Sequence, residues 1–261
     1  MTQNERRIFL IRELLTEQKY TDIEIPSSKQ EQEKLLRSLF NIRMPAPISD
    51  SFLRIQDAYL RERIKERGIT DFSESETFKN NIFLWQGDIT LLKCDAIVNA
   101  ANSQLLGCFY PCHSCIDNAI HTFAGVQLRA SCAELMKKQG HEEKTGGAKI
   151  TPAFNLPCKY VLHTVGPIVG SRLTKDDISK LSSCYRSCLE LAEQNNVNSI
   201  AFCCISTGEF HFPNREAAET AVKTVKEYKK ETDSEMKVIF NVFKDKDHEI
   251  YRKLLGADKK A

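Results

Sequence analysis

The stretch Asp95-Ala96-Ile97-Val98-Asn99-Ala100-Ala101-Asn102 joins a short apolar run to two alanines that lie between asparagines. An apolar run of this length predicts a buried strand over residues 96–99, since it is too short for a typical helix. Alanines after the strand would let a ligand approach the backbone closely, and asparagine suits the hydroxyl groups of a sugar. The same residues also fit an ordinary capped turn, so the stretch alone leaves both interpretations open.

The chain after residue 80 repeats this organisation, with short β-rich runs that alternate with longer amphipathic ones. The alternation predicts an α/β fold, in which helices cover both faces of a sheet. The predicted strands are residues 82–85, 96–99, 149–152, 160–164, 199–206 and 237–243, and the predicted helices are residues 114–123, 126–139, 176–194, 215–230 and 247–255. Ligands of open α/β sheets bind outside the carboxyl ends of the strands, so a site is expected in the loops that follow them.

Residues 1–75 differ from the rest in being helical throughout. Apolar residues recur at helical spacing, for example at Ile8, Ile11 and Leu15. A further helix is expected to begin near Ser49, a good N-cap residue type, and to end before Gly68. The polar stretch 71–79 is predicted to be a linker. We therefore expect two domains, a helical N-terminal extension over residues 1–75 and an α/β domain over residues 76–261.

The composition is typical of a soluble globular protein, with 41% hydrophobic and 28% charged residues in 261. The apolar runs are too short to cross a bilayer, and the N-terminus lacks the basic start and apolar stretch of a secretory signal. A net charge of +2 provides no global field that would recruit nucleic acid or an anionic membrane. We therefore expect a cytoplasmic protein with neither nucleic acid nor membrane as a partner. We also expect a monomer.

A cysteine-rich segment, Gly107-Cys108-Phe109-Tyr110-Pro111-Cys112-His113-Ser114-Cys115-Ile116-Asp117-Asn118, follows the strand at 96–99. Thiolate and imidazole are the preferred ligands of zinc, and close spacing lets one loop surround the ion. A set of thiols without metal is the alternative. Ligation by Cys108, Cys112, His113 and Cys115 would close the coordination shell and make the site structural. Ligation by Cys108, His113 and Cys115 alone would leave one position open, as catalysis requires.

Two other loops that follow strands carry groups able to bind a ligand. Asp88, in Gln86-Gly87-Asp88-Ile89, offers a carboxylate that can accept a hydrogen bond from the amine of a base, although Gly-Asp is also an ordinary turn. Residues 206–213, Ser-Thr-Gly-Glu-Phe-His-Phe-Pro, form a strand-to-helix loop whose backbone N–H groups can bind phosphate. The chain has no P-loop signature, and no dinucleotide-binding glycine motif follows the first strand, which argues against a nicotinamide-dependent dehydrogenase.

Taken in order, these motifs resemble those of the macrodomain family. The resemblance rests on Gln86-Gly87-Asp88-Ile89-Thr90, Asp95 through Asn102, His163-Thr164-Val165-Gly166-Pro167 and Ser206-Thr207-Gly208 through Pro213. The cysteine-rich insertion resembles that of a zinc-dependent branch, the bacterial and fungal ADP-ribosylhydrolases, and residues 1–75 resemble the N-terminal extension of bacterial members. The resemblance implies a three-layer α/β/α macrodomain with a central mixed sheet, plus the helical extension.

The resemblance also implies a role for each site residue. Asp88, helped by the backbone of Ile89, would hold the adenine amine. Phe243 would pack against adenine, and Asn102 would face the distal ribose and take part in catalysis. The diphosphate would lie on the backbone of Ser206, Thr207, Gly208, Glu209 and Phe210. The zinc ligands would be Cys108, His113 and Cys115, whereas Cys112 matches no ligand position.

Asp117 corresponds to the catalytic aspartate of related hydrolases that lack zinc, although a carboxylate in the first turn of a helix also fits a purely structural role. The activity implied is zinc (Zn2+)-dependent hydrolysis that removes mono-ADP-ribose from modified protein side chains and releases ADP-ribose. The resemblance further suggests O-linked adducts, opposition to a sirtuin-type ADP-ribosyltransferase, and a lipoyl carrier protein as one candidate substrate. The alternative is a module that binds ADP-ribose without turnover.

Overall fold

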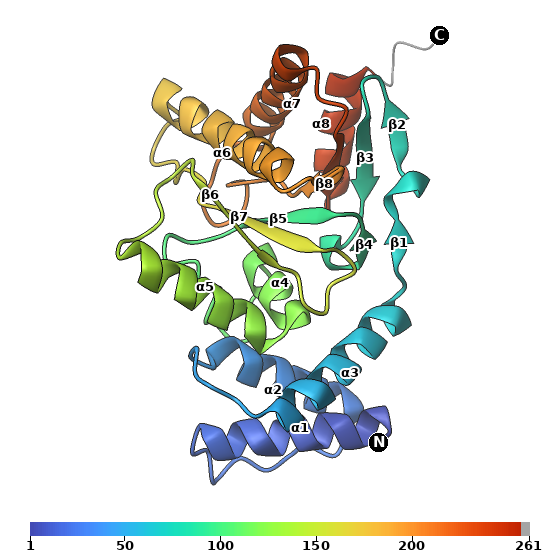
Figure 1. Cartoon of the computed structure of the whole chain (residues 1–261), viewed down its shortest axis with the longest axis vertical. Coiled ribbons are helices and arrows are strands. Elements are labelled where there is room, and N and C mark those ends of the chain that lie inside the picture. The colour runs from blue at the N-terminus through green and yellow to red at the C-terminus, as the bar shows by residue number, and fades with distance from the viewer. Residues whose placement is uncertain (257–261) are drawn as a thin grey trace.

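The N-terminal segment consists of three helices, which occupy one end of the molecule (Figure 1). The computed structural model describes residues 1–256, and its first helices are α1 (Gln3–Glu17), α2 (Lys29–Ile42) and α3 (Asp50–Arg67). As predicted, the Ser49 hydroxyl caps α3 by accepting a hydrogen bond from the N–H of Phe52, 3.2 Å away. Gly68 ends this helix with a φ of 89°, a conformation that glycine adopts without strain.

The central sheet has seven strands in the order β2-β3-β9-β8-β5-β7-β6. Their bounds are β2 (Glu76–Phe78), β3 (Ile82–Gln86), β5 (Ala96–Ala100), β6 (Ala148–Pro152), β7 (Tyr160–Thr164), β8 (Ser199–Phe202) and β9 (Lys237–Val242). The edge strands β2 and β6 are antiparallel to their neighbours, whereas the five inner strands are parallel. The sheet is therefore mixed, as predicted.

Helices cover both faces of this sheet, which gives three layers (Figure 1). One layer contains α6 (Lys175–Gln194), α7 (Asn214–Thr232) and α8 (Asp245–Leu255), and the other contains α4 (Ile116–Ala124) and α5 (Val126–Gln139). The N-terminal helices pack on this second layer, where α2 and α3 contact α4. The segment 1–67 therefore lies behind the helix that follows the cysteine-rich segment.

Two hydrophobic cores correspond to these parts. The larger core surrounds the sheet and includes Ile97, Val98 and Phe202. The smaller core lies among α1, α2 and α3 and also takes in Val126 of α5, which is 8% exposed. Burial of apolar side chains is the main force that holds such layers together. Val126 thus packs with the N-terminal helices although it belongs to α5, which covers the central sheet.

The structure corrects two details of the predicted elements. The stretch 71–79 is not a linker: β1 (Thr70–Asp71) pairs with β4 (Leu92–Lys93), a 3-10 turn covers Phe72–Glu74, and β2 pairs with β3. Strand β8 ends at Phe202 and not at residue 206, because the buried residues after it leave the sheet. The division into domains at residues 75 and 76 stays a prediction, and residues 257–261 of the second domain lie outside the described part.

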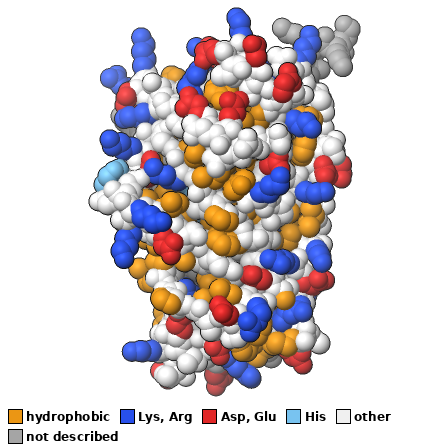
Figure 2. Space-filling model, in the orientation of Figure 1, with side chains coloured by type: hydrophobic (Ala, Val, Ile, Leu, Met, Phe, Trp, Pro, Cys, Tyr) orange, Lys and Arg blue, Asp and Glu red, His pale blue; other side chains and the backbone are white. Residues whose placement is uncertain are grey.

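The visible surface carries positive and negative side chains that are interspersed (Figure 2). This distribution agrees with the net charge of +2. None of the helices within residues 1–256 combines the length and the apolar character that spanning a bilayer would need.

Candidate active site

Five loops meet at one edge of the sheet. Strands β3, β9, β8, β5 and β7 are parallel neighbours, so their carboxyl ends lie side by side. The residues that follow these ends are, respectively, Asp88, Phe243, the loop 203–213 between β8 and α7, Asn102 with the cysteine-rich segment, and Gly166. The fold therefore brings the sequence motifs together.

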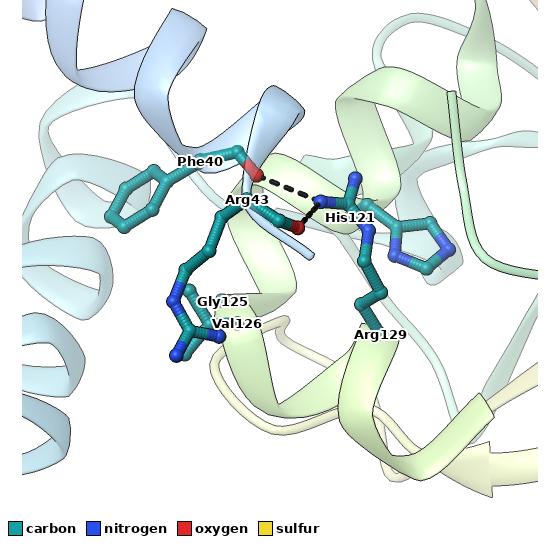
Figure 3. Close-up of a pocket in the computed structure, with 6 residues that line it drawn as sticks. All are labelled: Phe40, Arg43, His121, Gly125, Val126 and Arg129. Carbon is teal, nitrogen blue, oxygen red and sulfur yellow. Dashed lines mark hydrogen bonds between the residues drawn. The ribbon is translucent and has the colours of Figure 1, made fainter. Parts of the chain in front are cut away.

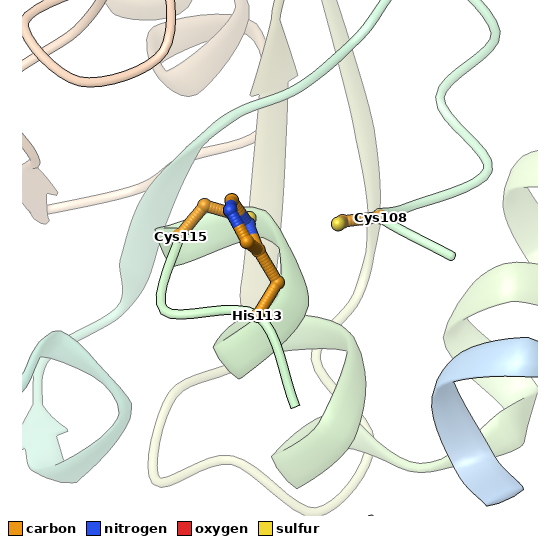
Figure 4. Close-up of side chains that lie close together, drawn as sticks. All are labelled: Cys108, His113 and Cys115. Carbon is orange, nitrogen blue, oxygen red and sulfur yellow. The ribbon is translucent and has the colours of Figure 1, made fainter. Parts of the chain in front are cut away.

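The cysteine-rich loop, defined here as residues 107–115, brings three potential metal ligands together. One ligand atom each from Cys108, His113 and Cys115 lies within 4.8 Å of the other two, with Cys108 facing the other two side chains (Figure 4). His113 Nδ1 is buried and has no hydrogen-bond partner within residues 1–256, so it is available to a metal. His113 Nε2 lies 3.7 Å from Glu209 Oε1 of the β8–α7 loop. Two thiols and an imidazole suit zinc.

Cys112 points away from this group, toward α2. Its N–H donates to Asn41 Oδ1 at 2.9 Å, its Sγ donates to the Lys34 carbonyl at 3.4 Å, and its Sγ lies 3.2 Å from Ser38 Oγ. Of the two ligand sets considered above, the structure brings together the set of three.

Asp117 lies in the first turn of α4, just after the cysteine-rich loop in the sequence, and is 5% exposed. Its Oδ1 accepts a hydrogen bond of 2.8 Å from Asn99 Nδ2 and lies 3.5 Å from His121 Nε2. Burial raises the pKa of Asp117 to about 6, against a smaller lowering by the Asn99 hydrogen bond. A carboxyl group that titrates in this range is suited to general acid–base chemistry near neutral pH.

His121 and Gly107 form the contact between α4 and the cysteine-rich loop. A Cβ atom at position 107 would lie 2.8 Å from the His121 ring, and Gly107 has a φ of 79°, so any other residue would be strained there. Neither nitrogen of His121 has a hydrogen-bond partner within residues 1–256, and burial lowers its pKa well below the usual value. The imidazole is therefore neutral in the core.

A second group of potential ligands lies deeper, among His121, Cys132 and His163. The nitrogens of His163 are both in use, since Nδ1 lies 3.2 Å from Asn99 Nδ2 and Nε2 lies 3.0 Å from Thr151 Oγ1. His163 thereby supports Asn99, and through it Asp117, by hydrogen bonding. Sequence reasoning placed His163 within a family motif but did not find this network.

Asn102 braces the turn that leads into the cysteine-rich loop. Its Nδ2 donates to the Gly107 carbonyl at 3.0 Å, and its Oδ1 accepts from the Gln104 N–H at 3.1 Å. The side chain thus has a local structural role, in agreement with the capped turn that the sequence left open as one interpretation. Contact with a ribose stays a prediction.

Asp88 faces an arginine of the N-terminal segment. Its Oδ1 accepts from the N–H of Thr90 at 2.9 Å and from the Thr90 hydroxyl at 2.7 Å, and its Oδ2 pairs with Arg67 of α3. The Arg67 guanidinium also lies 4.1 Å from the centre of the Phe123 ring. Ile89 is buried and its carbonyl accepts from the Leu92 N–H, so the part assigned to its backbone in adenine binding stays a prediction. No sequence signal pointed to Arg67, which lies in α3, 21 residues before Asp88.

The β8–α7 loop presents free backbone donors. The N–H groups of Gly208, Glu209 and Phe210 make no hydrogen bond to other residues within the range 1–256. The loop is held by bonds from Phe212 N–H to the Ser206 carbonyl, 3.0 Å, and from Val169 N–H to the Phe210 carbonyl, 2.9 Å. Three unpaired N–H groups before the start of α7 suit an anion.

Thr207 and Ser206 differ from the rest of that loop. Thr207 donates from its hydroxyl to the Cys204 carbonyl at 3.0 Å, and its N–H faces the same carbonyl. Ser206 has a φ of 65° and a buried hydroxyl against Gly166, where a Cβ atom would come within 2.0 Å of Ser206 Oγ. These two residues therefore shape the loop, whereas the next three present donors.

Phe243 follows β9 and is 74% exposed. An aromatic ring left so open beside a binding edge is suited to stacking against a planar ligand. It lies at the opposite end of the row of loops from the cysteine-rich loop, because β3 and β9 lie toward one edge of the sheet and β5 and β7 toward the other.

Arg129 of α5 connects Leu106, just before the cysteine-rich loop, with the C-terminal end of α2, and Figure 3 shows its bonds on the α2 side. Its Nε donates to the Leu106 carbonyl at 2.6 Å, and its Nη1 donates to the carbonyls of Phe40, at 3.0 Å, and Arg43. Burial lowers the pKa of Arg129 to about 10. A small cavity of about 10 Å³ beside it is lined by Phe40, Arg43, His121, Gly125, Val126 and Arg129. The sequence analysis did not identify Arg129.

Known proteins resemble this chain over most of its length. The family model of the Macro domain matches residues 98–221. The Protein-ADP-ribose hydrolase of Treponema medium is 59% identical over 98% of this chain and 100% of its own. The Protein-ADP-ribose hydrolase of Staphylococcus aureus strain MRSA252 is 49% identical over 99% of this chain and 98% of its own. Both similarities therefore include the N-terminal helices.

A solved structure supports the same relationship. A mutant Oceanobacillus iheyensis macrodomain with ADPR superposes with a TM-score of 0.63 and is 35% identical, over 72% of this chain and 98% of that chain.

Proposed function

Because this chain belongs to the macrodomain family and, within it, to the protein-ADP-ribose hydrolases, we propose that it is a zinc-dependent hydrolase that removes mono-ADP-ribose from modified protein side chains. One observation carries the proposal: three potential zinc ligands of the cysteine-rich loop converge beside the buried carboxyl of Asp117. A reactive centre is thus set at one end of a row of ligand-binding loops.

The proposed ligand lies along the edge of the sheet. Adenine would stack on Phe243, and its amine would donate a hydrogen bond to Asp88 Oδ2, which keeps acceptor capacity beside Arg67, whereas Oδ1 already accepts twice from Thr90. The diphosphate would accept hydrogen bonds from the free N–H groups of Gly208, Glu209 and Phe210. The distal ribose would then reach Asn102 and the cysteine-rich loop. The related macrodomain with ADPR supports this class of ligand.

Cys108, His113 and Cys115 would hold the zinc, and the donor set fits it. Burial raises the pKa of Cys115 to about 12, so its thiolate form needs an adjacent positive charge, which a bound cation provides. With three protein ligands the ion would supply a Lewis acid beside the distal ribose. His113 Nε2 faces the carboxylate of Glu209 at 3.7 Å, and a carboxylate near the second ring nitrogen helps to orient a ligating imidazole.

Asp117 would do the proton chemistry. The bond that breaks joins the anomeric carbon to the protein side chain, and the attacking water must lose a proton. A carboxylate close to the ribose can accept that proton, and Asn99 orients it by donating to Oδ1. Asn102 would keep Gly107, and with it the loop, in place beside the ribose.

The direct test is release of free ADP-ribose from a mono-ADP-ribosylated protein. We expect wild-type protein to release it and Asp117→Asn to release far less. The competing hypothesis, a module that only binds ADP-ribose, predicts binding by both proteins and release by neither.

The resemblance also motivates finer proposals. Opposition to a sirtuin-type transferase and a lipoyl carrier protein as substrate are tested by offering carrier protein modified by such a transferase. O-linked adducts should be cleaved faster than N-linked adducts on the same carrier. A cytoplasmic location and a monomeric state stay predictions.

A further inference from the structure

We propose that helix α2 of the N-terminal segment positions the cysteine-rich loop for metal binding, with Arg37 and Asn41 as the positioning residues. The inference rests on the proposed function in so far as the metal is zinc. It assigns a role in the site to the N-terminal helices, although they lie outside the α/β domain.

Arg37 fastens the loop to the start of α4. Its Nη2 donates to the His113 carbonyl at 3.0 Å and to Asn118 Oδ1 at 2.8 Å, and its Nε donates to the same oxygen at 3.2 Å. Asn118, which is fully buried, in turn donates to the Tyr110 carbonyl at 3.0 Å. One planar guanidinium thereby holds the backbone of a ligand residue and the loop segment before it.

Asn41 holds the turn between the first ligand and the second. It is 1% exposed, accepts from the Cys112 N–H at 2.9 Å, and donates to Thr122 of α4 at 3.0 Å. Cys112 has a φ of 54°, a conformation that non-glycine residues disfavour. The hydrogen bond from α2 stabilises this backbone, and the Cys112 side chain is drawn toward Ser38 and away from the ligands.

Arg129 connects the other end of the loop to the same helix. It binds the Leu106 carbonyl just before the loop and the carbonyls of Phe40 and Arg43 at the C-terminal end of α2. Residues 107–115 contain no helix or strand, so their shape depends on contacts of this kind. Hydrogen bonds thus connect both ends and the middle of the loop to α2.

This arrangement affects metal affinity because convergence of three ligand atoms depends on the loop backbone. Contacts that orient metal ligands are worth about 10- to 100-fold in metal affinity or activity. Loss of the Arg37 contacts should therefore loosen His113 and lower zinc affinity, whereas the loops at the adenine end should be unaffected.

The test compares Arg37→Ala with Lys34→Ala in the full-length chain. Lys34 lies one turn earlier on α2, and its ammonium makes no hydrogen bond or ion pair to residues 1–256, so it controls for loss of charge on the helix. Three quantities are measured: zinc affinity by competition with a chelator, affinity for ADP, and hydrogen exchange of the segment 108–118 in zinc-free protein.

We expect Arg37→Ala to lower zinc affinity about 10- to 100-fold and to speed hydrogen exchange in the segment 108–118, with ADP affinity unchanged. Lys34→Ala should match wild type in all three. If Arg37→Ala loses ADP binding as well, the same quantities are measured for Arg37→Lys, because lysine keeps the charge but lacks the fork that reaches both acceptors. We expect Arg37→Lys to lower zinc affinity and to leave ADP affinity unchanged.

The inference would be overturned if the Arg37 variants showed the same hydrogen exchange and the same zinc affinity as the wild-type protein. The proposed function fails separately, if wild-type protein binds no zinc. In that case the exchange measurement still judges the positioning role of α2.

Discussion

Asp88 and Asp117 show how surroundings divide the work between two carboxylates. Asp88 is paired with the cation of Arg67 and accepts from Thr90, at the end of the site proposed to bind adenine. Asp117 is buried, with an amide and a neutral imidazole as its nearest polar groups, and its pKa rises to about 6. The first environment suits binding and the second suits proton transfer.

Replacement of Asp117 by asparagine should separate these tasks. The substitution keeps the size of the side chain but removes the base, so kcat should fall by about 10²–10⁴-fold. ADP affinity should stay within about twofold of wild type, because the adenine and diphosphate loops are untouched. Single-turnover kinetics and calorimetry measure the two quantities, and an unchanged kcat would remove Asp117 from the mechanism.

Asp88→Ala should weaken ADP binding. A hydrogen bond to a charged group contributes about 1.5–3 kcal/mol, which corresponds to about 10- to 150-fold in affinity. Asp71→Ala is the control, since Asp71 pairs with Lys93 on β4, away from the carboxyl ends of the inner strands. Calorimetry that gave equal affinities for the two variants would exclude Asp88 from the site.

At the scale of elements, the cysteine-rich loop is the part on which the proposed zinc chemistry depends. Cys112 lies between two ligand candidates in sequence but faces α2, where Ser38 and Lys34 contact its sulfur. Spacing alone could not decide between three and four ligands, because the deciding contacts come from residues more than seventy positions earlier. The same reason explains why Arg37, Asn41 and Arg129 were not predicted.

The elements themselves were largely predictable where apolar periodicity was long. The inner strands and the helices of residues 114–255 appear close to their predicted places, and Ser49 and Gly68 bound α3 as expected. Strand β2 was missed because Glu76-Thr77-Phe78 is a short, largely polar edge strand. The end of β8 was misplaced because Cys203 and Ile205 are buried outside the sheet, and burial alone does not distinguish strand from loop.

Metal analysis of single cysteine variants tests the ligand set. Cys112→Ser should retain about one zinc per chain, because its sulfur faces α2, whereas Cys108→Ser should lose most of it. Elemental analysis after dialysis gives the answer. Zinc lost from Cys112→Ser but kept in Cys108→Ser would reverse the assignment.

At the scale of the whole molecule, the fold joins a row of binding loops to a helical support. The parallel strands bring the loops proposed to bind adenine, diphosphate and ribose to one edge of the sheet, and the N-terminal helices pack on α4, which follows the cysteine-rich loop. Arg67 pairs with Asp88 and Arg37 donates to the His113 carbonyl, so the N-terminal segment contacts both ends of the row of loops.

The buried histidines predict acid sensitivity of the whole fold. Burial lowers the pKa of His163 to about 4 and also lowers the pKa of His121 well below its usual value, so the unfolded chain binds these protons more tightly than the folded one. The free energy of unfolding should therefore decrease as pH falls from about 6.5 toward 4. His163 contributes about 2 kcal/mol of this loss between pH 7 and 5, whereas Asp117, whose pKa is raised, acts in the opposite direction.

Urea unfolding of wild type and His163→Gln at pH 7 and pH 5 measures this contribution. Glutamine has no proton to gain in this range, so the variant should lose less stability on acidification even if it is less stable at both values. Equal losses in the two proteins would mean that His163 does not control the pH dependence.

The central claim is that a zinc held by Cys108, His113 and Cys115 acts in hydrolysis and not merely in folding of the loop. The most direct measurement is turnover and ADP affinity of the same wild-type sample before chelation, after chelation and after zinc is restored, with metal content measured each time. We predict that turnover is lost on chelation and returns with zinc, while ADP affinity persists throughout. Full turnover in protein shown to be free of zinc would contradict the account, and joint loss of turnover and ADP affinity would mean that the metal is structural.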